Sequence, residues 1–133
     1  MRSIKSALGV LFAVTALCAW AQGDTYPSRP IKFLLPLSAG SGGDAIGRLL
    51  GESMAKKLGA SIYVDNKVGA GGTIGAAQAA KSPNDGYTIT MGGMTPHIIA
   101  PAVYAKLPYD PVRDFSQVGR IGTAGVVVVS SND

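Results

Sequence analysis

The sequence predicts an α/β fold, with a mainly parallel sheet and helices flanking it. Two observations carry this prediction. Short apolar runs are followed twice by a glycine-rich loop and then by a segment of helical character, and further strand-like runs come later in the chain. Strand, loop and helix in this repeated order indicate right-handed βαβ units. Ligands of such sheets bind where loops leave the carboxyl ends of the strands, so both glycine loops are expected at the binding edge.

The first unit spans a strand and a long helix. Residues 31–37 (IKFLLPL) form the apolar run typical of a buried parallel strand. Residues 44–58 then place apolar side chains at the spacing of an amphipathic helix: Ile46, Leu49, Leu50, Met54 and Leu58. Asp44 is a candidate cap for this helix and lies four residues before Arg48 on the same face. Gly59 is placed to end it.

The second unit begins at residues 61–64 (SIYV), which are expected to form a strand. The glycine-dense stretch NKVGAGGTIGAAQAA follows and is expected to become helical from about Thr73 to Lys81. Glycine turns at helix starts hold anions, because the first backbone N–H groups of a helix lack partners and carry the positive end of its dipole. The remaining predicted elements are a turn and two strands: 82–86 (SPNDG), 87–91 (YTITM) and 126–129 (VVVV).

The N-terminus has the pattern of a secretory signal peptide. It opens with the basic stretch MRSIK, runs apolar from Ala7 and reaches Ala19-Trp20-Ala21. Cleavage after Ala21 would give a periplasmic mature chain of residues 22–133. It would also remove the one cysteine, Cys18, so the mature chain is expected to have no thiol chemistry, no disulfide and no cysteine-based metal site.

The charge pattern argues against nucleic acid as a partner. The chain has 12 Lys and Arg against 8 Asp and Glu, and loss of Arg2 and Lys5 would leave ten cations, a net charge of about +2. These cations are scattered, whereas nucleic-acid binders usually show a clustered basic face with interleaved aromatic residues.

Dinucleotide binding is one hypothesis for the first loop. Residues 40–45 (GSGGDA) fit G-x-G-x-x-A after a strand, and Asp65 lies about twenty residues further on. However, Asp44 would point a carboxylate at the helix end that must receive the pyrophosphate. The chain also has no G-K-[ST] sequence for a P-loop. No cofactor is therefore expected.

An exported α/β hydrolase is the alternative function from another class. Residues 39–43 (AGSGG) have the A-x-S-x-G form of a degenerate nucleophile elbow, with Ser41 as nucleophile and His97, the one histidine, as a possible base. In this fold the triad should run Ser, acid, His, and most of the supporting sheet is missing. Ser41 is explained more simply as a small residue in a tight turn.

The third hypothesis is non-covalent capture of a carboxylate, and it rests on five segments in order. They are YPSRPIKFLLP, AGSGGD, VDNKVGAGGTIGA, SPNDGYT and LPYDPVRDF. From Tyr26 onward the chain resembles the N-terminal part of a Bug-type periplasmic solute receptor. These receptors are the substrate-binding components of tripartite tricarboxylate transporters.

The resemblance implies a two-lobed fold of the periplasmic-binding-protein type, a monomer when full length, that holds a small carboxylate between its lobes. It implies a receptor rather than an enzyme, with the membrane subunits of the transporter as partners. Carried over by position, the first loop, the second loop and a third segment supply the ligand contacts: Ala39, Gly40, Ser41 and Asp44; Ala70, Gly71, Gly72 and Thr73; Gly92, Met94 and His97. Glycine lets backbone N–H groups approach a carboxylate closely without an arginine.

Four departures from the family pattern affect the ligand and the extent of the fold. Ser41 stands where a second glycine is usual, and Leu37 where an aromatic residue is usual. The residues before His97 are GMTP, which changes the shape of the cleft, and His97 itself is as readily structural as ligand-binding. Family members are more than twice as long. The chain is therefore expected to be an incomplete N-terminal lobe, with about residues 124–133 heading toward a second lobe.

Overall fold

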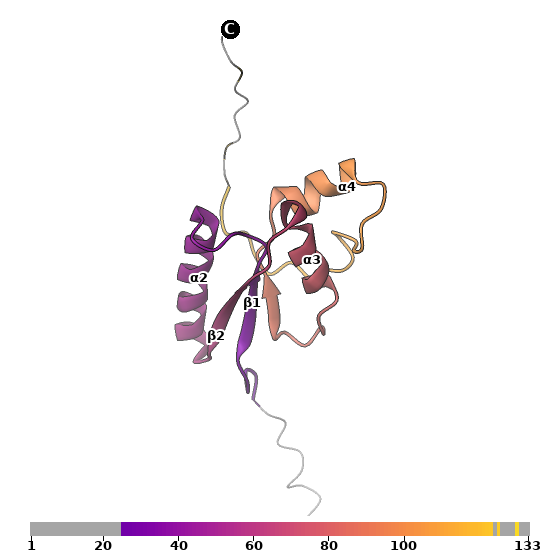
Figure 1. The fold of residues 1–133 in the computed structure, drawn as a ribbon. Coiled ribbons are helices and arrows are strands. Elements are labelled where there is room, and N and C mark those ends of the chain that lie inside the picture. The colour runs from indigo at the N-terminus through magenta and orange to yellow at the C-terminus, as the bar shows by residue number, and fades with distance from the viewer. Residues whose placement is uncertain (1–24, 124, 126–129, 131–133) are drawn as a thin grey trace, which may run out of the picture.

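The computed structural model describes residues 25–123, 125 and 130 (Figure 1). Within them the chain forms a three-stranded sheet with helices on both sides. The predicted signal peptide and the predicted strand 126–129 lie outside the described residues. The elements in chain order are β1 (Ile31–Leu35), α2 (Gly42–Leu58), β2 (Ile62–Asn66), a 3₁₀ turn η1 (Ala70–Gly72), α3 (Thr73–Ala80), β3 (Thr88–Thr90), a π-helical turn η2 (Thr95–Ile99) and α4 (Ala100–Val103).

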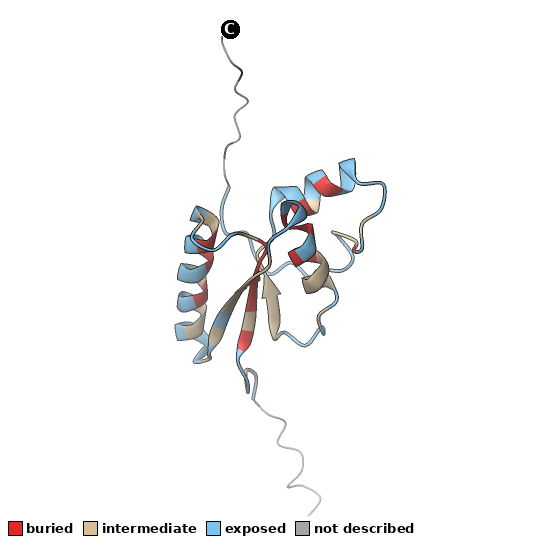
Figure 2. Cartoon of the chain, in the orientation of Figure 1, coloured by how far each residue is buried: buried red, intermediate tan, exposed pale blue. Residues whose placement is uncertain are grey.

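The sheet has the order β2-β1-β3, and both pairings are parallel, as the sequence predicted. Phe33 at the middle of β1 pairs with Val64 on one side and Ile89 on the other. The central strand supplies the core, because helices cover both of its faces (Figure 2). Its most buried side chains are Ile31, Phe33, Leu34 and Leu35.

Helix α2 packs on β1 through a row of glycines spaced four residues apart. A Cβ added at Gly47 would lie 2.6 Å from Cδ1 of Leu35, so the helix backbone sits directly on the leucine side chain. The three facing pairs are Gly43 with Leu37, Gly47 with Leu35 and Gly51 with Phe33. Four helical residues rise about 6.0 Å and two strand residues about 6.6 Å, so helix and strand stay in step along the contact.

Helix α3 covers the opposite face of the sheet. A Cβ at Gly75 would lie 2.8 Å from Cβ of Pro36, and Pro36 alternates with Leu35 and Leu37, which face α2. The result is a three-layer α/β/α arrangement, with α2 and α3 on either side of the strands (Figure 1).

Two expectations for α2 were wrong. Ile46 and Leu49 of the predicted apolar stripe are 50% and 68% exposed, because the face that packs on the sheet is the glycine row. The N-cap is Ser41, not Asp44: the Ser41 hydroxyl accepts a hydrogen bond from the Asp44 backbone N–H (3.2 Å). The predicted end of the helix is confirmed, since Gly59 adopts a left-handed conformation there (φ 61°).

The sequence did not predict the helical segment from Thr95 to Val103. Two prolines obscured it, although Pro96 is acceptable in a first helical turn. The segment is anchored by Tyr109, whose buried hydroxyl donates to the Pro96 carbonyl (2.6 Å). Among the described residues no helix is long and apolar enough to cross a membrane.

Candidate functional site

Three loops meet at the carboxyl edge of the sheet, because they follow three adjacent parallel strands. They are residues 36–41 after β1, 67–72 after β2 and 91–95 after β3. Gly72 lies at their junction: a Cβ there would be 3.1 Å from the Pro36 carbonyl oxygen and 3.6 Å from Cγ of Pro96. The structure thus brings together the three segments that the sequence assigned to the ligand.

The first loop presents backbone N–H groups at the start of α2. Its turn closes with a bond from Ser41 N to Ser38 O (3.1 Å), and Gly40 is left-handed (φ 80°). In the described part of the chain, no hydrogen bond uses the N–H groups of Ala39, Gly42 or Gly43. Ala39 and Gly42 are exposed. These amides lie near the positive end of the helix dipole, an arrangement that favours an anion.

Asp44 lies beneath this loop rather than on its surface. The residue is 3% exposed, and its carboxylate accepts bonds from Arg48 Nε (2.9 Å), Asn66 Nδ2 (2.8 Å) and Gly40 N (2.9 Å). These bonds, with the one from Arg48 foremost, hold the pKa of the Asp44 carboxyl well below its usual range. The carboxylate is therefore ionised at neutral pH and engaged by the protein.

The second loop is built from consecutive left-handed residues. Ala70 (φ 46°), Gly71 (φ 65°) and Gly72 (φ 91°) turn the chain tightly into α3. The N–H groups of Ala70 and Gly71 have no partner among the described residues, and both residues are exposed. Gly72 and Thr73 are buried, and the Thr73 hydroxyl donates to Ala70 O (2.9 Å). Ala70 and Gly71 thus offer amides to solvent, whereas Gly72 and Thr73 shape the turn.

The third segment packs against aromatic residues that come later in the chain. Gly92 and Met94 are exposed, while the partly buried His97 packs edge-on against Phe115 (ring centroids 4.9 Å apart). His97 Nδ1 accepts a long bond from Gly93 N (3.4 Å). Phe115 also packs on Tyr109, whose burial raises the pKa of its hydroxyl.

Four residues important to this edge were missed as site residues by sequence reasoning: Arg48, Asn66, Tyr109 and Phe115. The sequence carried a signal for all four. Tyr109 and Phe115 lie in LPYDPVRDF, Asn66 lies in VDNKVGAGGTIGA, and Arg48 follows Asp44 by four residues on the same helix face.

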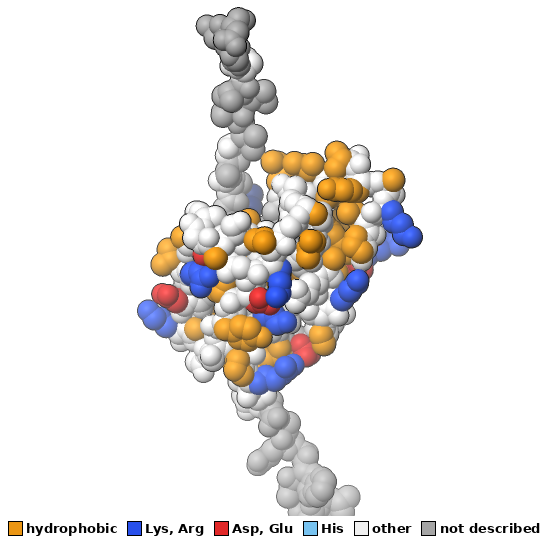
Figure 3. All heavy atoms as spheres, in the orientation of Figure 1, with side chains coloured by type: hydrophobic (Ala, Val, Ile, Leu, Met, Phe, Trp, Pro, Cys, Tyr) orange, Lys and Arg blue, Asp and Glu red, His pale blue; other side chains and the backbone are white. Residues whose placement is uncertain are grey.

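Ser41 is not arranged as a hydrolase nucleophile. Its hydroxyl caps α2, and no hydrogen bond among the described residues joins it to His97. Likewise, those residues contain no group of three or more potential metal ligands. Lys and Arg side chains are spread over the face shown in Figure 3 rather than gathered in one basic patch.

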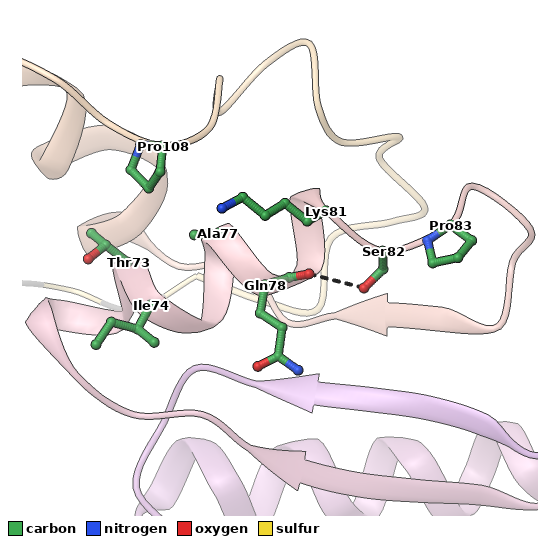
Figure 4. Close-up of a pocket in the computed structure, with 8 residues that line it drawn as sticks. All are labelled: Thr73, Ile74, Ala77, Gln78, Lys81, Ser82, Pro83 and Pro108. Carbon is green, nitrogen blue, oxygen red and sulfur yellow. Dashed lines mark hydrogen bonds between the residues drawn. The ribbon is translucent and has the colours of Figure 1, made fainter.

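An open hollow lies beside α3 (Figure 4). It is lined by residues of this helix, by the turn that follows it and by Pro108. It is largely apolar, and Lys81 is the one charged residue that lines it. The Ser82 hydroxyl beside it donates to Gln78 O (3.0 Å), which closes the helix end. The hollow lacks a convergent set of donors, so the loop edge is the better candidate for a carboxylate.

The chain matches the family model of the tripartite tricarboxylate transporter family receptors over residues 46–133. It is 39% identical over 127 residues to an Agrobacterium vitis protein described as "UPF0065 protein in the TAR-I ttuE-ttuC' intergenic region", and 31% identical over 132 residues to the protein BugT of Bordetella pertussis. These alignments cover 95% and 98% of this chain but 36% and 40% of the relatives, so the chain spans well under half of their length.

Two solved structures are similar to the described fold. The periplasmic binding protein BugD has a TM-score of 0.64 and 41% identity, with 68% of this chain and 30% of that chain covered. The protein MatC of Rhodopseudomonas palustris, solved with bound malate, has a TM-score of 0.64 and 38% identity, with 68% and 31% covered. The described α/β/α arrangement is therefore a fold shared with periplasmic binding proteins.

Proposed function

Because the chain belongs to the tripartite tricarboxylate transporter receptor family, we propose that it captures a small carboxylate as part of an extracytoplasmic receptor for such a transporter. The observation that carries the proposal is a set of backbone N–H groups on exposed residues of two adjacent glycine loops, for which the described residues provide no hydrogen-bond partner. Such groups stabilise a carboxylate by charge-assisted hydrogen bonds, and the helix dipole of α2 adds to the attraction.

The similarity to MatC with malate and to an R. palustris protein with adipate supports a dicarboxylate as ligand class. In the proposed mode one carboxylate lies at Ala39 and Gly42, and the other reaches Ala70 and Gly71. The two loops are shaped by Gly40, Ser41, Gly72 and Thr73. The third side of the proposed site is lined by Gly92, Met94 and His97. The chemistry is reversible binding, with no covalent step and no cofactor.

We further propose export to the periplasm and a place in the first lobe of a two-lobed monomer, closing on the ligand and presenting it to the transporter's membrane subunits. Family membership and the periplasmic binding proteins of similar fold support this location. N-terminal sequencing of the exported protein is expected to give a start near Gln22. Retention of Met1 in a cytosolic form would contradict export.

Gly42→Asp is the sharpest test of the site. A Cβ at Gly42 meets nothing within 4 Å, and an acidic residue in the first turn favours the helix, so the variant is expected to fold. The new carboxylate would lie where the ligand is proposed to bind and would repel it. Titration with malate and with adipate, followed by ¹H–¹⁵N NMR, is expected to show affinity reduced at least tenfold.

Ser53→Asp is the matched control. It adds the same charge at an exposed position on the same helix, about 16 Å further along the axis, and is expected to bind as the unmodified chain does. Equal affinities of the Gly42→Asp variant, the control and the unmodified chain would overturn the first loop as the carboxylate site.

A further inference from the structure

We propose that Arg48 and Asn66 are positioning residues of the carboxylate site: Arg48 neutralises the buried Asp44, and Asn66 ties the first loop to the end of β2. This inference rests on the proposed function. Among the hydrogen bonds of the described residues, none joins either side chain to the N–H groups of Ala39, Gly42 or Gly43. Both act through Asp44 and through the loop backbone.

Asp44 places a buried negative charge directly beneath the proposed anion site. Its carboxylate accepts a bond from Gly40 N (2.9 Å) and therefore fixes the loop from below. The same ionised group lies next to amides that are proposed to receive a second negative charge, and like charges at short range in a partly buried setting repel each other. A loop of this kind binds an anion well only if the charge beneath it is compensated.

Arg48 supplies the compensation. Its Nε donates to Asp44 Oδ2 (2.9 Å), the same oxygen that holds Gly40, and the pair is four residues apart on α2. Asp44 is almost fully buried while Arg48 is about half exposed, so the positive charge lies at the solvent side of the pair.

Asn66 completes the connection with three hydrogen bonds through its side-chain amide. Its Nδ2 donates both to Leu37 O (3.0 Å) and to Asp44 Oδ1 (2.8 Å), and its Oδ1 accepts from Arg48 (3.0 Å). The reversed amide would place an oxygen against two acceptors, so the side chain has one satisfactory orientation. The last residue of β2 thereby bonds to the start of the first loop at Leu37 and to the first turn of α2 at Asp44.

A double-mutant cycle tests the electrostatic role of Arg48, with malate as probe and the full chain as protein. Arg48→Met leaves Asp44 uncompensated and is expected to weaken malate binding at least tenfold at low ionic strength. Asp44→Asn combined with Arg48→Met removes both charges and is expected to restore affinity to within about threefold of the Asp44→Asn variant. Arg48→Lys keeps the charge and is expected to bind like the unmodified chain. Additive losses in the double variant would overturn this role, because loss of structural contacts alone gives no rescue.

A ligand-free measurement tests Asn66. Asn66→Ala removes the donors to Leu37 and Asp44, so amide exchange at Gly40 and Ser41 is expected to accelerate at least tenfold, with the remaining spectrum preserved. Asn84→Ala, at an exposed asparagine of the 82–86 turn, is the control and is expected to leave both amides unchanged. Unchanged exchange at Gly40 in the Asn66 variant would overturn the positioning role.

The two readouts separate this inference from the proposed function. If the unmodified chain binds neither malate nor adipate, the proposed function fails, and the positioning inference is decided by amide exchange alone. If the unmodified chain binds malate and the Arg48 and Asn66 variants bind it equally well, the inference fails and the proposed function stands.

Discussion

At the scale of single residues, the glycines of this chain have three different physical roles. Gly42 has open space around it and leaves an amide accessible, Gly47 lets a helix backbone touch a leucine, and Gly72 is buried with a left-handed backbone. The sequence predicted that glycine loops would matter but could not separate these roles, because they depend on what each missing side chain would meet. A substitution at Gly72 would therefore strain the turn as well as change the site.

The glycine row of α2 gives a prediction with opposite signs. Gly47→Ala puts a methyl group 2.6 Å from a buried Leu35 carbon, and overpacking of this kind costs about 1–3 kcal/mol. Gly51→Ala meets Phe33 at 3.5 Å, an ordinary contact, and gains up to about 1 kcal/mol of helix propensity. Urea unfolding is expected to show a less stable first variant and a more stable second one. Equal changes would mean that close packing at Gly47 is not limiting.

Asp44 gives a prediction on pH dependence. Its pKa in the folded chain is lowered, chiefly by the Arg48 hydrogen bond and further by Asn66 and Gly40. The stabilisation is therefore complete above the unfolded-state pKa of about 4 and is lost as the pH falls further. In urea unfolding from pH 7 to pH 2, Asp44→Asn is expected to flatten this decline. The variant is expected to keep a smaller dependence of stability on pH, because the pKa of Asp110 is also lowered. An unchanged profile would contradict the assignment.

At the scale of elements, the repeated order of strand, loop and helix was predictable, because apolar runs and glycine boundaries encode it locally. The predicted strand 31–37 became β1 at Ile31–Leu35, and the predicted helix 73–81 became α3 at Thr73–Ala80. The helical segment from Thr95 to Val103 was not predictable in this way, since its position depends on contacts with Tyr109 and Phe115, which come later in the chain.

Two of the segments that carried the family resemblance, YPSRPIKFLLP and SPNDGYT, make structural contacts with each other. YPSRP pairs with SPNDGYT at the end of the sheet opposite the site. There Arg29 lies over the Tyr87 ring (4.0 Å) and bonds Asp85 (2.6 Å), and the Tyr26 hydroxyl donates to Gly86 O (2.9 Å).

Tyr109→Phe tests the anchoring of the third segment. The variant keeps the ring but leaves the Pro96 carbonyl without its donor, which is expected to cost about 1–3 kcal/mol of stability in urea unfolding. The resonances of Gly93 and His97 are expected to shift as the segment loosens. Tyr104→Phe, at an exposed tyrosine, is the control and is expected to change little. Unchanged stability and unchanged resonances in the Tyr109→Phe variant would show that this hydrogen bond does not hold the segment.

At the scale of the whole molecule, the topology of the sheet determines where the candidate loops meet. It does not determine which side chains support those loops. The sequence located both glycine loops at the carboxyl edge, because parallel βαβ units leave no other place for them. The four-residue spacing also predicted that Arg48 lies beside Asp44, but not the bonds of Asn66 to both, since Asn66 comes close to them only through the parallel pairing of β1 and β2.

The 133-residue chain itself is expected to bind malate or adipate poorly or not at all, with a dissociation constant in the millimolar range or weaker. The four residues proposed to donate amides are all exposed: Ala39, Gly42, Ala70 and Gly71. A carboxylate bound there keeps much of its hydration. Each hydrogen bond then mainly replaces one to water and gains roughly 1 kcal/mol, while immobilising the ligand costs about 4 kcal/mol or more. A site enclosed from both sides would strengthen each bond by excluding water. Calorimetry and NMR titration on chain shown to be monodisperse by light scattering measure this directly. Micromolar binding by such a sample would mean that these three loops carry the whole site.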